Sequence, residues 1–122
     1  MAVTYNEAGI AEVPIGGRTD IIRTGELFER SYDHTDECGQ PRDWSNLEVQ
    51  SAIVYDILTL ATVEDIDVSF GGDPTLGVLT LTIAGTVMPA AGQYRYRIRV
   101  QPIGAGELRT LQEGRFTVGG AP

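Results

Sequence analysis

The sequence contains no lysine, one cysteine and one histidine. All nine basic residues are arginines, which codon bias in a GC-rich genome explains as readily as a need for planar guanidinium groups that pair with carboxylates. Cys38 has no second cysteine to pair with, so packing must stabilise the fold without an internal disulfide. With a single histidine, a nucleophile-and-base arrangement has only His34 and Cys38 as a weak candidate pair.

Long apolar runs are also missing. No run approaches the roughly 18 residues that a membrane span requires, and the N-terminus lacks the basic region and apolar core of a signal peptide. We therefore expect a soluble protein that is not exported by a cleaved signal. The formal net charge is −8, so nucleic acid and anionic membranes are repelled and are not expected as partners.

What the chain does contain is glycine and alternating β-type sequence. Its 122 residues suit one domain, and 15 glycines with 6 prolines indicate many turns between short elements. The clearest strand begins at Gly92, where apolar residues and arginines alternate. That alternation predicts a half-buried strand with two tyrosines, an isoleucine and a valine on one face. The other face carries Arg95, Arg97 and Arg99.

Further strands follow from the same alternation. We expect one strand in residues 19–32, bent at Gly25, and others at 47–56, 66–70, 79–83, 94–102 and 108–118. Tyr94 invites comparison with the tyrosine corner of immunoglobulin-like domains, and Gly114 is expected to supply a positive φ for the last hairpin. About seven strands at this spacing, with no helical stripe, predict an all-β, immunoglobulin-like antiparallel sandwich.

We divide the chain into an extended N-terminal arm (1–18), the sandwich (19–118) and a short C-terminal tail (119–122). The arm has too many apolar residues for an idle tail, so we expect it to lie against this domain or a neighbouring subunit. Its candidate interface residues are Val3, Tyr5, Ile10, Val13 and Ile15.

The acidic loop 33–38 places Asp33, His34, Asp36, Glu37 and Cys38 close together. Their order fits neither a calcium-binding EF-hand loop nor a zinc spacing, so a solvated loop is favoured over a cation site. No glycine-rich loop precedes a helix, as phosphate binding would require, and no carboxylate pair stands out as a glycosidase site. We assign no catalytic, metal-binding or cofactor-binding residue and predict no cofactor and no enzymatic activity.

The three arginines at 95, 97 and 99 carry two alternative interpretations. They face an acidic partner, or they pair across strands with acidic residues of the same chain, which the net charge favours. Both alternatives remain open from the sequence.

Five stretches together resemble a known group of proteins: Arg23–Phe28, Gly39–Ser45, Leu79–Leu81, Gly92–Ile98 and Leu111–Val118. In this order they are similar to small β-sandwich proteins of tailed bacteriophages, which include lateral-tail-fibre collar proteins and the N-terminal domains of upper-baseplate proteins. The resemblance covers about residues 19–118. It implies an immunoglobulin-like sandwich that assembles symmetrically in the virion, with no catalytic residues.

From this resemblance we expect a structural virion protein, synthesised in the host cytoplasm, which binds other virion proteins on the tail, neck or collar and forms a homo-oligomer or symmetric array. Its arm and sheet edges would make the contacts. Two alternatives stay open: a capsid decoration protein that clamps the head surface, and a receptor- or carbohydrate-binding module. The second needs exposed aromatic residues, and the chain has few aromatics in total.

Overall fold

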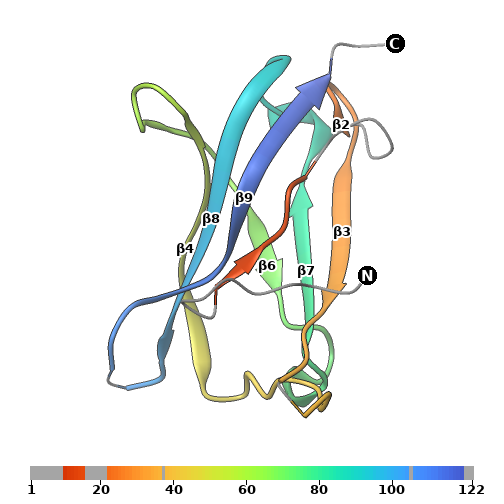
Figure 1. Ribbon diagram of the computed structural model, residues 1–122. Helices are drawn as coiled ribbons and strands as arrows, with labels where there is room; N and C mark the ends of the chain where they lie inside the picture. Colours follow the sequence, from red (N-terminus) through yellow and green to blue (C-terminus); the bar gives the residue numbers. More distant parts are fainter. Residues whose placement is uncertain (1–9, 16–21, 37, 105, 120–122) are drawn as a thin grey trace.

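Two sheets pack face to face in the computed structural model, which describes residues 10–15, 22–36, 38–104 and 106–119 (Figure 1). One sheet has the order β3-β7-β6, and the other has the order β1-β9-β8-β4-β5, with β2 also pairing with β9. The strands are β1 (Ala11–Glu12), β2 (Ile22–Arg23), β3 (Phe28–Asp33), β4 (Leu47–Asp56), β5 (Thr62–Asp65), β6 (Asp67–Ser69), β7 (Val78–Ile83), β8 (Gly92–Pro102) and β9 (Arg109–Gly119). This is the expected all-β sandwich, and its sheets are antiparallel except where β1 and β2 pair with β9 in parallel.

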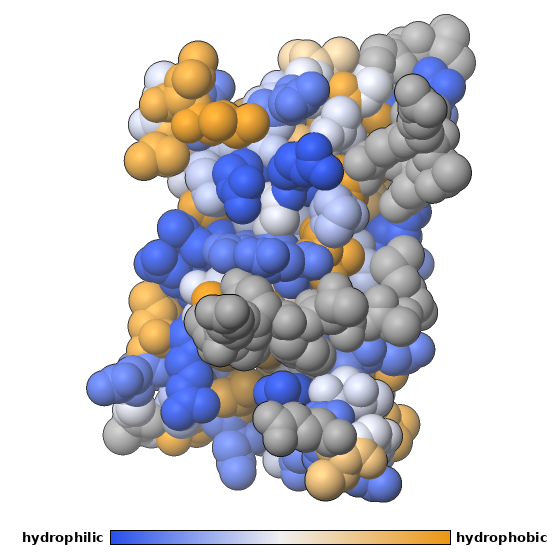
Figure 2. Space-filling view, viewed as in Figure 1, coloured by the Kyte–Doolittle hydropathy of each residue, from blue (hydrophilic) through white to orange (hydrophobic). Residues whose placement is uncertain are grey.

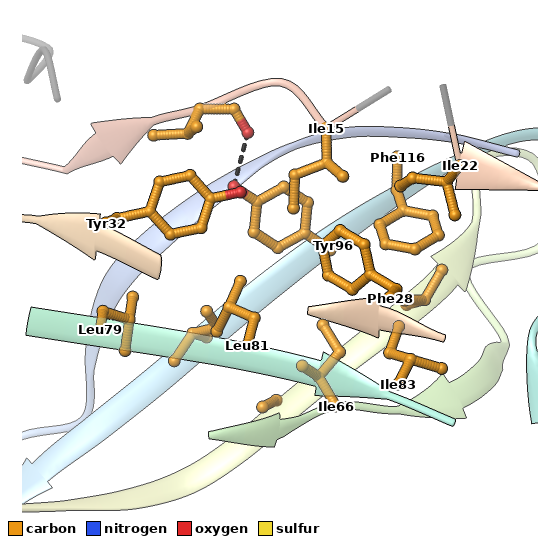
Figure 3. Packing of buried hydrophobic residues seen from close by; sticks show 14 of the residues in the cluster. Ile15, Ile22, Phe28, Tyr32, Ile66, Leu79, Leu81, Ile83, Tyr96 and Phe116 are labelled. Carbon is orange, nitrogen blue, oxygen red and sulfur yellow. Dashed lines mark hydrogen bonds between the residues drawn. The ribbon is translucent and has the colours of Figure 1, made fainter. Parts of the chain in front are cut away.

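The core lies between the two sheets and is built by the alternation seen in the sequence. On β8, Tyr96, Ile98 and Val100 are buried, while the arginines between them face outward. Opposite them, β7 contributes Leu79 and Leu81 (Figure 3). Helical structure in the described residues is limited to two 3-10 turns, at Pro74–Leu76 and Gly85–Val87. A side-chain period of two therefore explains both the layers and the core.

The chain changes sheets at two places, and at the first of them the sequence suggested a single strand. Residues 19–32 were expected to form one strand bent at Gly25, and this prediction is wrong. β2 belongs to one sheet and β3 to the other, and Gly25, with φ +84°, lies in the turn between them. Likewise β5 and β6 lie in different sheets, and the buried Ile66 sits at the crossing. Local alternation is the same on both sides of such a crossing, so it cannot reveal the change of partner.

The N-terminal residues that the structure describes belong to the sandwich. β1 runs parallel to β9, and the same path continues through Ile15, which bridges to Phe116. Ala11, Val13 and Ile15 all point into the core and are at most 6% exposed. The predicted boundary after residue 18 thus falls beyond residues that complete the larger sheet. Val3 and Tyr5 lie outside the described residues.

The sequence predicted particular roles for one tyrosine of β8, Tyr94, and one glycine of β9, Gly114. The tyrosine corner is confirmed, because the Tyr94 hydroxyl donates a hydrogen bond to the Ala90 carbonyl over 2.8 Å. The role given to Gly114 is wrong, since the positive-φ glycines of the last hairpin are Gly104 and Gly106. A Cβ at residue 114 would lie 2.8 Å from the carbonyl carbon of Val13 and 3.2 Å from the Tyr96 ring. Gly114 is therefore needed for the close approach of β1 to β9.

We predict that Gly114→Ala lowers the free energy of unfolding by about 1–3 kcal/mol, because the new methyl group must push the β1 segment away from β9. Urea denaturation followed by tryptophan fluorescence measures this change. Gly72→Ala is the matched control, since a Cβ there meets nothing within 4 Å. Equal stability of the two variants would contradict the close-approach role of Gly114.

Candidate functional site

A chain of hydrogen bonds crosses the interior at one end of the core. The His34 ring Nε2 lies 2.9 Å from the Gln112 side-chain oxygen, and the Gln112 amide nitrogen lies 2.9 Å from the Tyr96 hydroxyl. Tyr96 in turn bonds to the Val13 carbonyl over 2.5 Å, which is the dashed line in Figure 3. His34, Gln112 and Tyr96 are all at most 1% exposed. The chain joins the β3–β4 loop, β9, β8 and the β1 segment.

The donor and acceptor groups in this series of hydrogen bonds determine which atom carries each proton. A carbonyl can only accept, so the Tyr96 hydroxyl donates to Val13 and accepts from the Gln112 amide nitrogen. The Gln112 oxygen then accepts from His34, which must carry its proton on Nε2. Burial raises the pKa of Tyr96, which keeps this hydroxyl a donor. These hydrogen bonds thus hold the packed segments together, and they use His34, the only histidine in the sequence.

The acidic loop does not gather its side chains into a cation site. His34 is turned inward against Trp44, at 4.9 Å between ring centroids. The Asp36 carboxylate accepts the backbone N–H groups of Cys38 and Gln40. Among the described residues, no three His, Cys, Asp or Glu side chains come together as a possible metal site. Glu37 lies outside the described residues.

The outer face of the larger sheet holds the arginines predicted from the sequence. Arg95, Arg97 and Arg99 are half-buried there, and β9 adds Arg115. Figure 2 shows hydrophilic side chains in a row across β4, β8 and β9. Arg97 lies opposite Glu113 in register and stacks its guanidinium over the Tyr55 ring at 5.5 Å. The cross-strand pairing expected as an alternative therefore fits Arg97 in register.

Arg95 and Arg115 have a different environment. They lie directly opposite each other on β8 and β9, and like charges at such a pair of positions destabilise a sheet. Both line a shallow hollow of about 370 Å³, together with Glu12 and Pro14. Arg97 contributes a further unsatisfied group, because its Nε is buried without a hydrogen-bond partner among the described residues. We call the surface formed by residues 95, 97, 99 and 115 the arginine face.

The sequence predictions missed an apolar surface at the turn between β4 and β5. Ile57, Leu58 and Leu60 are 43%, 91% and 70% exposed there. They form an apolar group at the upper left of Figure 2, over the β4–β5 turn in Figure 1. The apolar loop composition Ile57-Leu58-Thr59-Leu60 was the available signal, but it resembles a continuing strand. We call residues 57–60 the hairpin tip.

The hairpin tip is held in one conformation. The Asp56 carboxylate accepts the backbone N–H groups of Leu58 and Thr59, and the Leu60 N–H bonds to the Asp56 carbonyl. Leu60 has φ +61°, which is uncommon for any residue other than glycine. The local hydrogen bonds to Asp56 hold Leu60 in this conformation.

Of the candidate interface residues, Val13 and Ile15 are buried in the core of their own domain and are not available to a partner. Ile10 is half-buried at the edge of a cleft. The arginine face is the part of the predicted set that the structure brings together on an accessible surface.

No protein-family model matches the chain, and a search of curated proteins finds no match. In the part of the chain that the structure describes, no helix is long and apolar enough to cross a membrane. The family resemblance drawn from the sequence stays a prediction.

We predict that His34 makes the protein less stable as the pH falls below 6.5. Burial lowers the pKa of His34 from 6.5, and nearby Arg42 adds to this, while the Gln112 hydrogen bond and Asp33 oppose it. Below pH 6.5 the unfolded chain therefore binds a proton that the native state does not. The free energy of unfolding should then fall by up to about 1.4 kcal/mol per pH unit until the native pKa is reached.

Urea unfolding between about pH 7.5 and pH 5.5 measures this dependence, because most carboxylates titrate near pH 4. His34→Gln is the control, since it removes the titrating group and should flatten the curve in this window. If the variant and the wild type lose the same free energy over this range, the assignment to His34 is wrong.

Proposed function

We propose that this protein is a structural component of a tailed-bacteriophage virion, assembling on the tail, neck or collar without enzymatic activity. The observation that carries the proposal is the arginine face, which gathers four of the nine arginines of an acidic chain on one sheet surface. A surface of this kind binds an acidic protein partner, because cations on one partner meet anions on the other. The phage assignment rests on the sequence resemblance.

The described residues leave the arginine face and the hairpin tip as the surfaces suited to association. Val13 and Ile15 are buried, so their side chains cannot make the contact with a partner that was expected of the arm. We therefore assign that contact to the arginine face. Beside the hairpin tip, β5 is an edge strand of the larger sheet with exposed Val63. An edge strand offers backbone groups to a partner strand. Assembly would combine these main-chain groups with charged contacts.

Copy number in the particle tests the proposed location. We expect quantitative mass spectrometry of purified particles from the source phage to find a small number of copies, relative to the major capsid protein, that matches a tail or neck ring. Tens to hundreds of copies would instead indicate a capsid decoration protein, and absence from particles would overturn the virion assignment.

The arginine face is tested by Arg95→Gln combined with Arg115→Gln. Exposed ion pairs are worth up to about 1 kcal/mol each, so losing two should weaken attachment on the order of tenfold. The measurement is the number of copies retained on particles washed at increasing salt concentration, since exposed charge contacts are screened by salt. Arg23→Gln with Arg30→Gln removes the same charge elsewhere. If both double variants are retained equally, the arginine face is not the contact surface.

A further inference from the structure

Charges on the outer face of the larger sheet are arranged in two unlike rows. Strands β1, β9, β8 and β4 are neighbours in this sheet (Figure 1). In one row Arg97 of β8 lies opposite Glu113 of β9, and Glu113 lies opposite Glu12 of β1. Two residues further along, Arg95 lies opposite Arg115. The carboxylates therefore meet in one row and the guanidinium groups meet in the next.

Composition does not force this arrangement. The chain has 17 acidic residues and 9 arginines, so an acidic residue opposite Arg95 would suit the balance of the chain as a whole. Like charges at opposite positions destabilise a sheet, whereas unlike charges there stabilise it. Proteins break such local rules mainly at functional sites. The pair of Arg95 with Arg115 is therefore a candidate binding position.

The two arginines share a concave surface. They line the shallow hollow of about 370 Å³ together with Glu12, Pro14 and Gly114. Two guanidinium charges and one carboxylate charge leave this hollow with a net charge of +1. Arg95 is half-buried, while Arg115, Glu12 and Pro14 are exposed, so a side chain of another protein can reach the hollow.

The larger cleft of the molecule has a different charge balance. It has a volume of about 790 Å³ and lies between the β3–β4 loop and the ends of β8 and β9. Its wall holds Arg42 and Arg109, and it also holds Asp36 and Asp43, so its formal charges cancel. Of these two concave surfaces, the hollow on the arginine face is the one whose cations exceed its anions.

We propose that the hollow binds one carboxylate of an acidic partner protein between Arg95 and Arg115. This inference rests on the proposed structural function and names the chemical group that the arginine face would hold. A carboxylate has two acceptor oxygens, so each of the two guanidinium groups can donate to one of them. The bound anion also lies between two cations that otherwise repel each other.

The charge of the hollow selects the type of anion. One carboxylate carries a single negative charge, which brings the net charge of the hollow from +1 to zero. A phosphate dianion would leave an excess negative charge beside Glu12, and like charges in close contact disfavour binding. The hollow therefore suits an aspartate or glutamate side chain better than a phosphate group.

Titration of the purified full chain with N-acetyl-glutamate amide tests this inference, because that molecule carries one side-chain carboxylate. Two exposed ion pairs should give a Kd on the order of 10–100 mM. The measurement is the NMR signals of the arginine Nε–H groups, at constant ionic strength. We expect saturable shifts for Arg95 and Arg115 and none for Arg30, which lies on the other sheet. Uncharged N-acetyl-glutamine amide should shift none of these signals.

Equal shifts of all arginine signals would show only unspecific attraction between charges and would overturn the site. Inorganic phosphate, added at the same ionic strength, separates the two types of anion. If phosphate shifts the Arg95 and Arg115 signals at lower concentration than the carboxylate does, the assignment to a carboxylate is wrong.

Variants of the hollow should change the affinity in opposite directions. Arg115→Gln removes one ion pair and should weaken carboxylate binding about fivefold. Arg115→Lys keeps the charge but not the planar group, so it should weaken binding less. Glu12→Gln raises the net charge of the hollow to +2 and should strengthen binding. Weaker or unchanged binding by the Glu12→Gln protein would contradict the charge balance. Arg30→Gln is the control and should bind as the wild type does.

Stability without ligand is an independent measurement. Because Arg115→Gln removes the repulsion from Arg95, it should raise the melting temperature by about 1–5 °C. A lower melting temperature would show that Arg115 serves the fold itself, which contradicts a position kept for binding. Arg30→Gln again gives the effect of losing one positive charge elsewhere.

The inference and the proposed function can be told apart when either fails. If no carboxylate binds at the hollow but particles carry copies of the protein, this inference is wrong and the virion assignment stands. If the carboxylate binds as expected but the protein is absent from particles, the site is supported and the virion assignment is rejected.

Discussion

The hydrogen-bonded chain from His34 to Val13 is the interaction on which the arrangement of one end of the sandwich depends. It satisfies buried polar groups that would otherwise be costly, and it ties two outer segments to the central strands β8 and β9. The β1 segment is placed by the Tyr96 hydroxyl, and Gly114 leaves the room for that approach. The β3–β4 loop is placed by His34, and Trp44 packs on the His34 ring. The cleft wall is thus positioned from the interior.

Local alternation was enough to predict β4, β7, β8 and β9, because each of these strands has one face in the core and the other outside. It could not show that the chain changes sheets near Gly25 and Ile66, since the choice of partner strand is a tertiary property. Gln112 could have been placed inside from the sequence, because it shares the inward phase of Phe116 and Val118. The burial of His34 could not have been predicted, because a polar loop has no alternation to show which side chains point inward.

The candidate surfaces, too, were only partly predictable from the sequence. The arginines of β8 were predictable as one face, but the like-charge pair of Arg95 with Arg115 required the register of β9. The apolar hairpin tip was hidden because its residues continue the apolar character of β4, and only the Asp56 turn ends the strand. Burial of Val13 and Ile15 shows that apolar residues near a chain end can complete the core of their own domain.

Pairing of β1 with β9 also bears on how the protein folds. Tyr96 contacts Val13 across 83 residues of sequence, and Thr24 contacts Gly119 across 95. Bringing together residues so far apart in the sequence costs loop-closure entropy before the contact can stabilise the fold, and this slows folding. During synthesis, the larger sheet cannot close until β9 has left the ribosome. Until then the apolar side chains of Ala11, Val13 and Ile15 have no core to enter, and the nascent chain is exposed to aggregation for most of its translation.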